Sequence, residues 1–295
     1  MVGVARSGTT LMRNLLERSD RIAIARENHF LGHLFGFRGV RHFLRKAGDL
    51  AAEDTIRRIV EMIYADKGER LSRWREVSIY WRWLVANMPR EELERRLLAA
   101  ERTERGLMAT FMRAYADTLG RPIMGEKTPA HLTYVDTLLD WFPNGRVVHM
   151  IRDPRAVFVS DLRRRRTKPR RPMSWLDKVP GLLSLIVLLQ VTLTWRDAAR
   201  RHSAFQRRYP DRYMLVKFED VVSRPDDVLP RLFLFLGVEL PADPTNVDVY
   251  ARGYNVGQHG IDSGATDRWR THIGRLPRVW LSVVLRSHMR RLGYE

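Results

Sequence analysis

The first residues of the chain combine types that can bind an anion. An apolar run over residues 2–5 leads into a polar turn, and apolar residues at helical spacing follow; the turn contains Arg6, Ser7, Gly8, Thr9 and Thr10. A strand, a glycine turn and a helix start in this order are typical of a phosphate-binding loop. Backbone N–H groups at a helix start and the helix dipole both attract negative charge. We therefore predict a strand over residues 2–5, a helix over residues 8–18 and an anion site at the turn.

This loop differs from the one that binds nucleoside triphosphates. Gly3 and Gly8 keep the spacing of G-x-x-x-x-G-K-[ST], but Thr9 stands at the lysine position and the cation is Arg6. A loop without that lysine lacks its contact with the β- and γ-phosphates, so it should hold a different anion. The alternative is an ordinary strand-to-helix turn, with the helix capped by Ser7 or Thr9.

Residues 6–11, R-S-G-T-T-L, resemble the 5′-phosphosulfate loop of the sulfotransferases that use 3′-phosphoadenosine 5′-phosphosulfate, PAPS. The form with arginine resembles the bacterial and Golgi-type branch, which includes the tyrosylprotein-type enzymes. The resemblance implies that Arg6 contacts the reacting phosphosulfate and is a catalytic as well as a binding residue. It implies cofactor contacts for Ser7, Gly8, Thr9, Thr10 and Leu11.

A second motif lies in residues 147–161, VVHMIRDPRAVFVSD. Residues 147–151 are expected to form a buried strand, and the R-D-P-R turn after them to start a helix. The resemblance implies that Arg152 and Ser160 hold the 3′-phosphate of the cofactor, and a planar guanidinium suits such a group because it can donate two hydrogen bonds to it. We interpret Asp153 and Arg155 as a solvated ion pair.

The catalytic residues follow from two further matches. Residues 125–129, G-E-K-T-P, resemble a family element in which Lys127 faces the sulfuryl group, while the alternative is a Lys127 paired with Glu126 at a helix start. The resemblance also places the general base 21 positions after Arg6, at Glu27. His29 is the second candidate base, and a surface ion pair of Glu27 with Arg26 is the remaining alternative.

The resemblance extends over essentially the whole chain. Residues 213–222 and a proline-started helix that ends before Gly237 match family elements, as does the terminal L-G-Y-E. Strands near residues 2–5, 21–25, 122–125, 146–151 and 213–217 alternate with helices, which predicts an α/β fold. We expect a P-loop-type three-layer α/β/α arrangement with a parallel central sheet.

The length of 295 residues is consistent with a single sulfotransferase domain over residues 1–295. Residues 38–118 are expected to form a helical insertion on the acceptor side. An aromatic group in this insertion could line an acceptor pocket or pack in the core; it consists of Trp74, Tyr80, Trp81 and Trp83.

The chain is strongly basic, with 52 Lys and Arg against 34 Asp and Glu, a net charge of +18. The run at residues 163–171 is read in three ways: a solvated loop before a buried core helix, a rim that gathers the polyanionic cofactor, or a surface that docks on anionic lipid. The apolar stretch at residues 182–193 is expected to be too short and interrupted to span a bilayer. No nucleic-acid motif is found, so no nucleic acid is expected as a partner.

The absence of cysteine excludes a disulfide scaffold. No metal is predicted, and His29 and His33 are interpreted as helix-surface residues. We expect a cytoplasmic protein, with a peripheral membrane location and an anchor upstream of Met1 left open because the first strand is short. The oligomeric state is not predicted.

The resemblance implies transfer of a sulfuryl group from PAPS to a hydroxyl or amine, which leaves 3′,5′-adenosine bisphosphate. The acceptor is a carbohydrate, lipid, peptide or small molecule, and the sequence does not choose among them. The alternative is an ATP-using P-loop kinase or nucleotide-binding protein, which would need the loop lysine and carboxylates for Mg²⁺.

Overall fold

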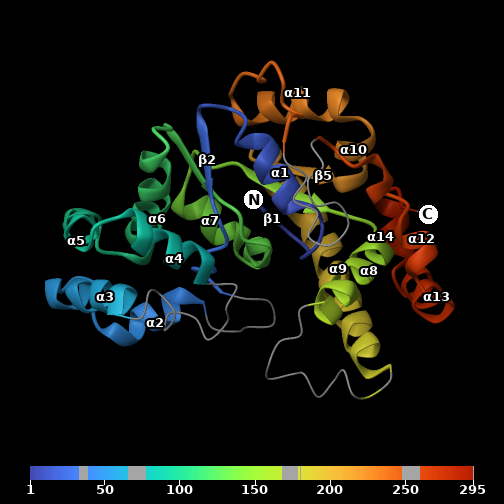
Figure 1. The fold of residues 1–295 in the computed structure, drawn as a ribbon, viewed down its shortest axis with the longest axis horizontal. Helices are drawn as coiled ribbons and strands as arrows, with labels where there is room; N and C mark the ends of the chain where they lie inside the picture. Colours follow the sequence, from blue (N-terminus) through green and yellow to red (C-terminus); the bar gives the residue numbers. More distant parts are fainter. Residues whose placement is uncertain (33–38, 66–77, 168–178, 180, 248–259, 295) are drawn as a thin grey trace. The chain divides into compact units, whose positions relative to one another are not determined.

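A computed structural model describes the chain except for residues 33–38, 66–77, 168–178, 180, 248–259 and 295 (Figure 1). The described residues form two compact units. The first unit consists of Met1–Val2 and Leu16–Gly145, and the second of Gly3–Leu15 and Arg146–Glu295. Each unit has its own strands and helices, and the prediction of one domain over residues 1–295 stays a prediction.

The first unit is built around two parallel strands. β2 (Ile22–Ala25) pairs with β3 (Ile123–Glu126), and Ala25 lies opposite Glu126 at the carboxyl end of the pair. Every residue of β2 is buried, as expected for a strand of a covered parallel sheet. α6 (Glu104–Thr118) packs on both strands. This end of the pair is where the chain continues toward Glu27 and Lys127.

Helices occupy most of residues 38–118 in this unit. They are α2 (Val40–Ala47), α3 (Glu53–Ala65), α4 (Ser78–Asn87), α5 (Arg90–Ala99) and α6. After β3 the chain forms a 3₁₀ helix, Pro129–Tyr134, and then α7 (Val135–Trp141). The acceptor-side role of these helices stays a prediction.

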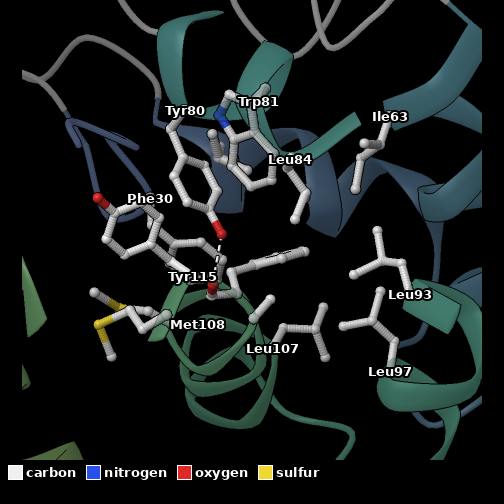
Figure 2. Packing of buried hydrophobic residues seen from close by; sticks show 14 of the residues in the cluster. Phe30, Ile63, Tyr80, Trp81, Leu84, Leu93, Leu97, Leu107, Met108 and Tyr115 are labelled. Atoms are coloured by element: carbon white, nitrogen blue, oxygen red, sulfur yellow. Dashed lines mark hydrogen bonds between the residues drawn. The ribbon is translucent and has the colours of Figure 1, made fainter. Parts of the chain in front are cut away.

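The core of the first unit explains most of the aromatic group found in the sequence. Tyr80 and Trp81 are buried side by side (Figure 2). Trp81 packs edge-on against Phe111 with ring centroids 4.9 Å apart. The Tyr80 hydroxyl donates to the Phe111 carbonyl at 2.5 Å, which satisfies the one polar atom that this ring brings into the core. Tyr80 and Trp81 are therefore core residues, Trp83 is half-buried, and Trp74 lies outside the described residues.

The second unit, which starts at Gly3 within β1 (Val2–Gly3), has a sheet in the order β1, β4 (Val147–Ile151), β5 (Tyr213–Lys217). β4 and β5 are parallel, with Val147 opposite Tyr213. All five residues of β4 are buried. The helices of this unit are α1 (Thr9–Leu16), α8 (Pro154–Thr167), α9 (Leu182–Arg208), α10 (Phe218–Ser223), α11 (Pro225–Leu236), α12 (Trp269–His272), α13 (Arg275–Val284) and α14 (Arg286–Arg291). The predicted α/β fold with parallel strands is confirmed.

Several boundaries differ from the sequence-based expectation. β1 ends at Gly3, because the chain already turns at Val4, and α1 ends at Leu16 rather than at residue 18. The expected loop at residues 163–171 is helical as far as Thr167, since α8 continues through the arginines, and residues 168–171 lie outside the described part.

α9 is longer than the apolar run that predicted it. It has 27 residues, and by length and composition alone it could cross a membrane, so the argument from shortness was wrong. A core helix of a soluble protein has the same composition, and 39% of the apolar window is buried. Among the buried residues, Trp195 donates from Nε1 to the Arg152 carbonyl at 2.8 Å, which fixes α9 to the end of β4.

A buried histidine in β4 should make the second unit sensitive to acid. His149 Nδ1 lies 2.5 Å from the Tyr213 hydroxyl, and His202 Nδ1 lies 3.2 Å from the same oxygen. Burial, with a smaller contribution from the charge of His202, lowers the pKa of His149 from 6.5 to about 3. There is therefore a pH range in which His149 is neutral in the folded protein but protonated in the unfolded chain.

The stability should accordingly fall as the pH falls from 6.5 toward about 3. Within that range this one group contributes up to about 1.4 kcal/mol per pH unit. We expect His149→Gln to be less stable than the parent at neutral pH, but to lose less stability on acidification. Urea unfolding between neutral pH and about pH 4 would measure this. His272→Gln, at an exposed position of the same unit, is the control, and equal slopes for the parent and His149→Gln would contradict the assignment.

Candidate functional site

The turn after β1 has the backbone of an anion-binding loop. Ser7 is buried, and its hydroxyl donates to the Val4 carbonyl at 2.6 Å, which closes the turn. Arg6 has a φ of 72°, in the left-handed region that non-glycine residues rarely adopt. Such strain persists where the surroundings hold it, and it collects at functional positions.

The helix after this turn begins at Thr9, so Thr9, Thr10 and Leu11 form its first turn. The N–H groups of a first turn have no intrahelical partner and can donate to an anion. Thr9 is buried, whereas Thr10 is exposed and Leu11 half-buried. Gly8 has a φ of 86°, and a Cβ there would lie 2.3 Å from Cδ2 of Phe218. Only glycine fits at this position.

Arg6 and Ser160 contact each other directly. Nε of Arg6 donates to Oγ of Ser160 at 3.1 Å, although 154 residues separate them in the sequence. The sequence assigned Arg6 to one phosphate of the cofactor and Ser160 to another, so the two predicted contacts are neighbours in the second unit. A guanidinium and a hydroxyl at this separation can both donate to bound anions.

Arg152 follows β4 and is held from several sides. Its Nη2 donates to the Ala265 carbonyl at 2.6 Å, and its guanidinium lies 4.1 Å from the centre of the Phe218 ring. Burial lowers the pKa of Arg152 to about 10, and Arg6 adds to the effect while Glu219 opposes it. The side chain thus remains a cation at neutral pH. Its buried Nε has no hydrogen-bond partner among the described residues, so it could donate to an anion.

The interpretation of Asp153 and Arg155 as a solvated pair is wrong in one respect. They do form an ion pair, at 2.6 Å, but both side chains are buried. Asp153 Oδ1 also accepts from the Arg155 backbone N–H at 2.8 Å at the start of α8, and the Arg155 guanidinium lies over the Trp269 ring. The pair is therefore a structural support for the turn that carries Arg152.

Glu219 ties the terminal motif of the chain to the same turn. One of its carboxylate oxygens accepts from the Asp153 backbone N–H at 2.9 Å, and the other accepts from the Tyr294 hydroxyl at 2.9 Å. Burial raises the pKa of Glu219. The E-D and L-G-Y matches in the sequence pointed to these residues without showing that they meet.

The first unit holds the other two predicted catalytic residues. Nζ of Lys127 donates to Oε1 of Glu27 at 2.5 Å, and Oε2 of Glu27 lies 3.4 Å from Nε2 of His29. Burial acts to raise the pKa of Glu27, but Lys127 and His29 outweigh it and hold that pKa well below its usual range. The pairings of Glu27 with Arg26 and of Lys127 with Glu126 are thus not the ones formed.

His29 is buried in an irregular segment, so its interpretation as a helix-surface residue is wrong. His33, its expected partner on that helix face, lies outside the described residues. His29 has a φ of 49°, and Arg6 is the other non-glycine residue with positive φ in the described part of the chain. Both of these strained positions coincide with predicted site residues.

Glu126 and His131, neither of which the sequence assigned to the site, support this part of the first unit. Nε2 of His131 accepts from the Leu31 backbone N–H at 3.2 Å, so its proton is on Nδ1, which donates to Glu126 at 2.8 Å. Although burial acts to raise the pKa of Glu126, His131 lowers it below the usual value. The buried Glu126–His131 pair thereby fixes the main chain four residues after Glu27. The sequence signal that could have indicated this pair is the presence of Glu126 and His131 on either side of the K-T-P element.

The predicted site residues therefore form two groups. Arg6, Arg152 and Ser160 gather in the second unit, and Glu27 and Lys127 pair in the first. Within the described ranges, no set of three or more His, Cys, Asp or Glu side chains could hold a metal ion.

Comparison with known proteins gives one family and a shared fold. The model of a family described as the sulfotransferase family matches residues 1–242. The sulfotransferase domain from the curacin biosynthetic pathway has a TM-score of 0.58 at 18% identity, over 100% of this chain and 96% of that one. The sulfotransferase domain from the Synechococcus PCC 7002 olefin synthase has a TM-score of 0.55 at 19% identity, over 100% and 93%. At these identities the likeness shows the fold. Among curated proteins no match is found.

The close approach of Gly8 to Phe218 makes a testable prediction. We expect Gly8→Ala to displace the ring on which Arg152 lies, and so to abolish binding of 3′,5′-adenosine bisphosphate measured by calorimetry. Gly181→Ala is the matched control, because Gly181 has a φ of 82° but no atom of the described residues lies within 4 Å of its Cβ position. Both variants carry similar backbone strain, about 1–3 kcal/mol. Parental affinity for 3′,5′-adenosine bisphosphate in a folded Gly8→Ala protein would show that the close approach of Gly8 to Phe218 is not required for binding.

Proposed function

The chain belongs to the sulfotransferase family, and from that premise we propose that its sulfuryl donor is PAPS. A sulfotransferase moves a sulfuryl group to an acceptor, and with this donor the other product is 3′,5′-adenosine bisphosphate. That product carries phosphates on two carbons of one ribose. The protein must therefore offer two anion contacts a short distance apart.

The observation that carries the proposal is the contact between Arg6 and Ser160. It joins the loop assigned to the 5′-phosphosulfate with the helix position assigned to the 3′-phosphate, at 3.1 Å. Arg152, also assigned to the 3′-phosphate, is a partly buried cation close enough to Arg6 for the two charges to interact. Charge-assisted hydrogen bonds of this kind are the strongest that a protein offers a phosphate.

The ATP-using alternative explains these residues less well. Thr9 stands where a triphosphate-binding loop needs its lysine, and Arg152 and Ser160 have no role toward a nucleotide without a 3′-phosphate. Stabilisation of the protein by ATP with Mg²⁺, but not by 3′,5′-adenosine bisphosphate, would favour that alternative.

We propose Glu27 as the general base. The acceptor oxygen or nitrogen forms a bond to sulfur while the bond from sulfur to the bridging oxygen of the nucleotide breaks, and the acceptor proton passes to the Glu27 carboxylate. Negative charge develops on the departing nucleotide, and the resemblance assigns its stabilisation to Lys127. In the Glu27–Lys127 pair the carboxylate is ionised but weakly basic. Any weakening of that ion pair as Lys127 turns toward the leaving group raises the basicity of Glu27.

We propose that the acceptor group is a hydroxyl or an amine, without assigning the class of molecule that carries it. The candidates remain a carbohydrate, a lipid, a peptide or a small molecule. A panel of acceptors from these four classes, incubated with labelled PAPS, would identify which one receives the label.

The cofactor assignment predicts the effect of Arg152→Ala. We expect the affinity for 3′,5′-adenosine bisphosphate to fall by about 1.5–3 kcal/mol, which is about 10- to 150-fold, because a charge-assisted bond is lost. Ser160→Ala should lose less, and Arg231→Ala, at an exposed position of α11, is the control. Calorimetric titration gives the affinities. Parental affinity in both site variants would show that these residues do not hold the 3′-phosphate.

The base assignment predicts a loss of turnover in Glu27→Gln. We expect kcat to fall about 10²–10⁴-fold, the usual contribution of a general base, with little change in cofactor affinity. Turnover is followed as release of 3′,5′-adenosine bisphosphate with an acceptor from the panel. Near-parental turnover would transfer the role to His29, which His29→Asn tests.

Lys127→Met should change the pH profile in a defined direction. Lys127 holds the pKa of Glu27 below its usual range, so its removal raises that pKa. The base is then protonated at a higher pH, and the acid limb of the kcat profile moves to higher pH. A limb at the parental position would show that Glu27 is not the group that titrates.

A further inference from the structure

α13 of the second unit exposes the side chains that a helix of a soluble protein normally buries. Its one buried residue is Leu281, and its exposed apolar residues are Leu276, Val279, Trp280, Val283 and Val284. Leu276 is 83% exposed and Val283 66% exposed. An amphipathic helix on a soluble domain usually turns its apolar stripe toward the core. This stripe faces away from it.

A second exposed apolar row lies on α9, beside α13. Leu185, Leu189 and Leu193 repeat every four residues, so they share one side of the helix, and all three are exposed. Nε1 of Trp280 donates to Oγ1 of Thr192 at 3.1 Å, and Thr192 adjoins Leu193 in the sequence. We call the two rows together the α9–α13 face. Large exposed apolar patches of this kind mark interaction surfaces.

Arginines border this face, and acidic residues do not interrupt them on α13 and α14. Residues 275–291 contain five arginines and no Asp or Glu. Arginines of α9 and α14 lie around His288. Burial, followed by the charges of Arg291, Arg196 and Arg200, lowers the pKa of this histidine. On the α8 side, Arg165 Nη2 donates to Gln190 Oε1 at 2.6 Å, which fixes the arginine-rich end of α8 against the apolar half of α9.

We propose that the α9–α13 face docks on the surface of a bilayer that contains anionic lipid. Apolar side chains enter the boundary between headgroups and acyl chains, and the bordering arginines contact the anionic headgroups. Trp280 suits this boundary, because its N–H is already satisfied by Thr192 and its exposed ring surface is apolar. The opposite side of α9 is buried in the second unit through Val187, Val191 and Trp195, so the helix lies on the membrane and does not cross it.

The composition of the face favours lipid over other occupants. A second copy of the chain would bring another charge of +18 against the same arginines. A nucleic acid would match the arginines but leave the leucines and valines without an apolar partner. The face contains none of the residues assigned to the cofactor or to the base, so the proposal is independent of the proposed reaction.

Vesicle flotation of the full chain tests the apolar part of the proposal. We expect binding to phosphatidylcholine vesicles that contain phosphatidylserine, and at least about a tenfold weaker partition for the double variant Leu276→Gln/Val283→Gln, since two exposed side chains no longer enter the apolar layer. Leu234→Gln is the matched control, because Leu234 is 80% exposed on α11 of the same unit. Parental binding by the double variant overturns the proposal.

The charge part needs a separate comparison. We expect Arg275→Gln/Arg278→Gln to weaken binding and to reduce its dependence on salt. Arg207→Gln/Arg231→Gln removes the same charge at exposed positions in the last turn of α9 and on α11, outside the two apolar rows, and should change binding less. Equal binding to phosphatidylcholine alone overturns the requirement for anionic lipid. Dimerisation that Leu276→Gln/Val283→Gln abolishes, without vesicle binding by the parent, assigns the face to a second copy.

All of these variants should retain the parental thermal midpoint and bind 3′,5′-adenosine bisphosphate as the parent does. That result separates failure of membrane binding from failure of the fold or of the proposed reaction.

Discussion

The constraint on which the second unit depends is the presence of an arginine cation at the end of a buried strand. β4 is buried along its whole length, so the residue after it emerges where water is scarce. A charge placed there is unfavourable unless other groups compensate. The Phe218 ring, the Ala265 carbonyl and the charge of Glu219 compensate for Arg152. They come from two segments distant in the sequence, so holding one cation requires both α10 and the chain before α12 to be in place.

In the first unit the electrostatic constraint concerns a carboxylate, Glu27, paired with a lysine. A base for proton transfer must be ionised but also basic, and these demands conflict when a lysine lies 2.5 Å from the carboxylate. The Glu27–Lys127 pair favours ionisation at the expense of basicity. The buried Glu126–His131 pair holds the backbone near Glu27 through a neutral imidazole, so this support adds no further cation to the neighbourhood. Under the roles proposed for Glu27 and Lys127, weakening of this ion pair during the reaction would restore the basicity of Glu27.

The sequence was a good guide where a signal is local. β4 and β5 were predicted at their observed bounds, because runs of buried residues between turns are recognisable without knowledge of their neighbours. Gly237 ends α11 in the left-handed conformation, as a glycine after a helix predicts. The sequence was a poor guide where the environment decides. His29 and the pair Asp153–Arg155 were expected at the surface, yet tertiary packing buries all three. The Arg6–Ser160 contact and the role of His131 depend on chain segments that meet only in the fold, and no spacing rule reports them.

α9 shows the limit of composition most clearly. The same leucines, valines and isoleucine predict a core helix, a membrane span or an interfacial helix, because hydropathy does not record direction. The structure supplies the direction: Val187, Val191 and Trp195 face inward, while Leu185, Leu189 and Leu193 face outward. The inner side of α9 already contacts the end of β4 through Trp195, so only the outer side of the helix is available to contact a lipid surface. Because its two sides differ in this way, α9 both supports the end of β4 that carries Arg152 and leaves an apolar row exposed.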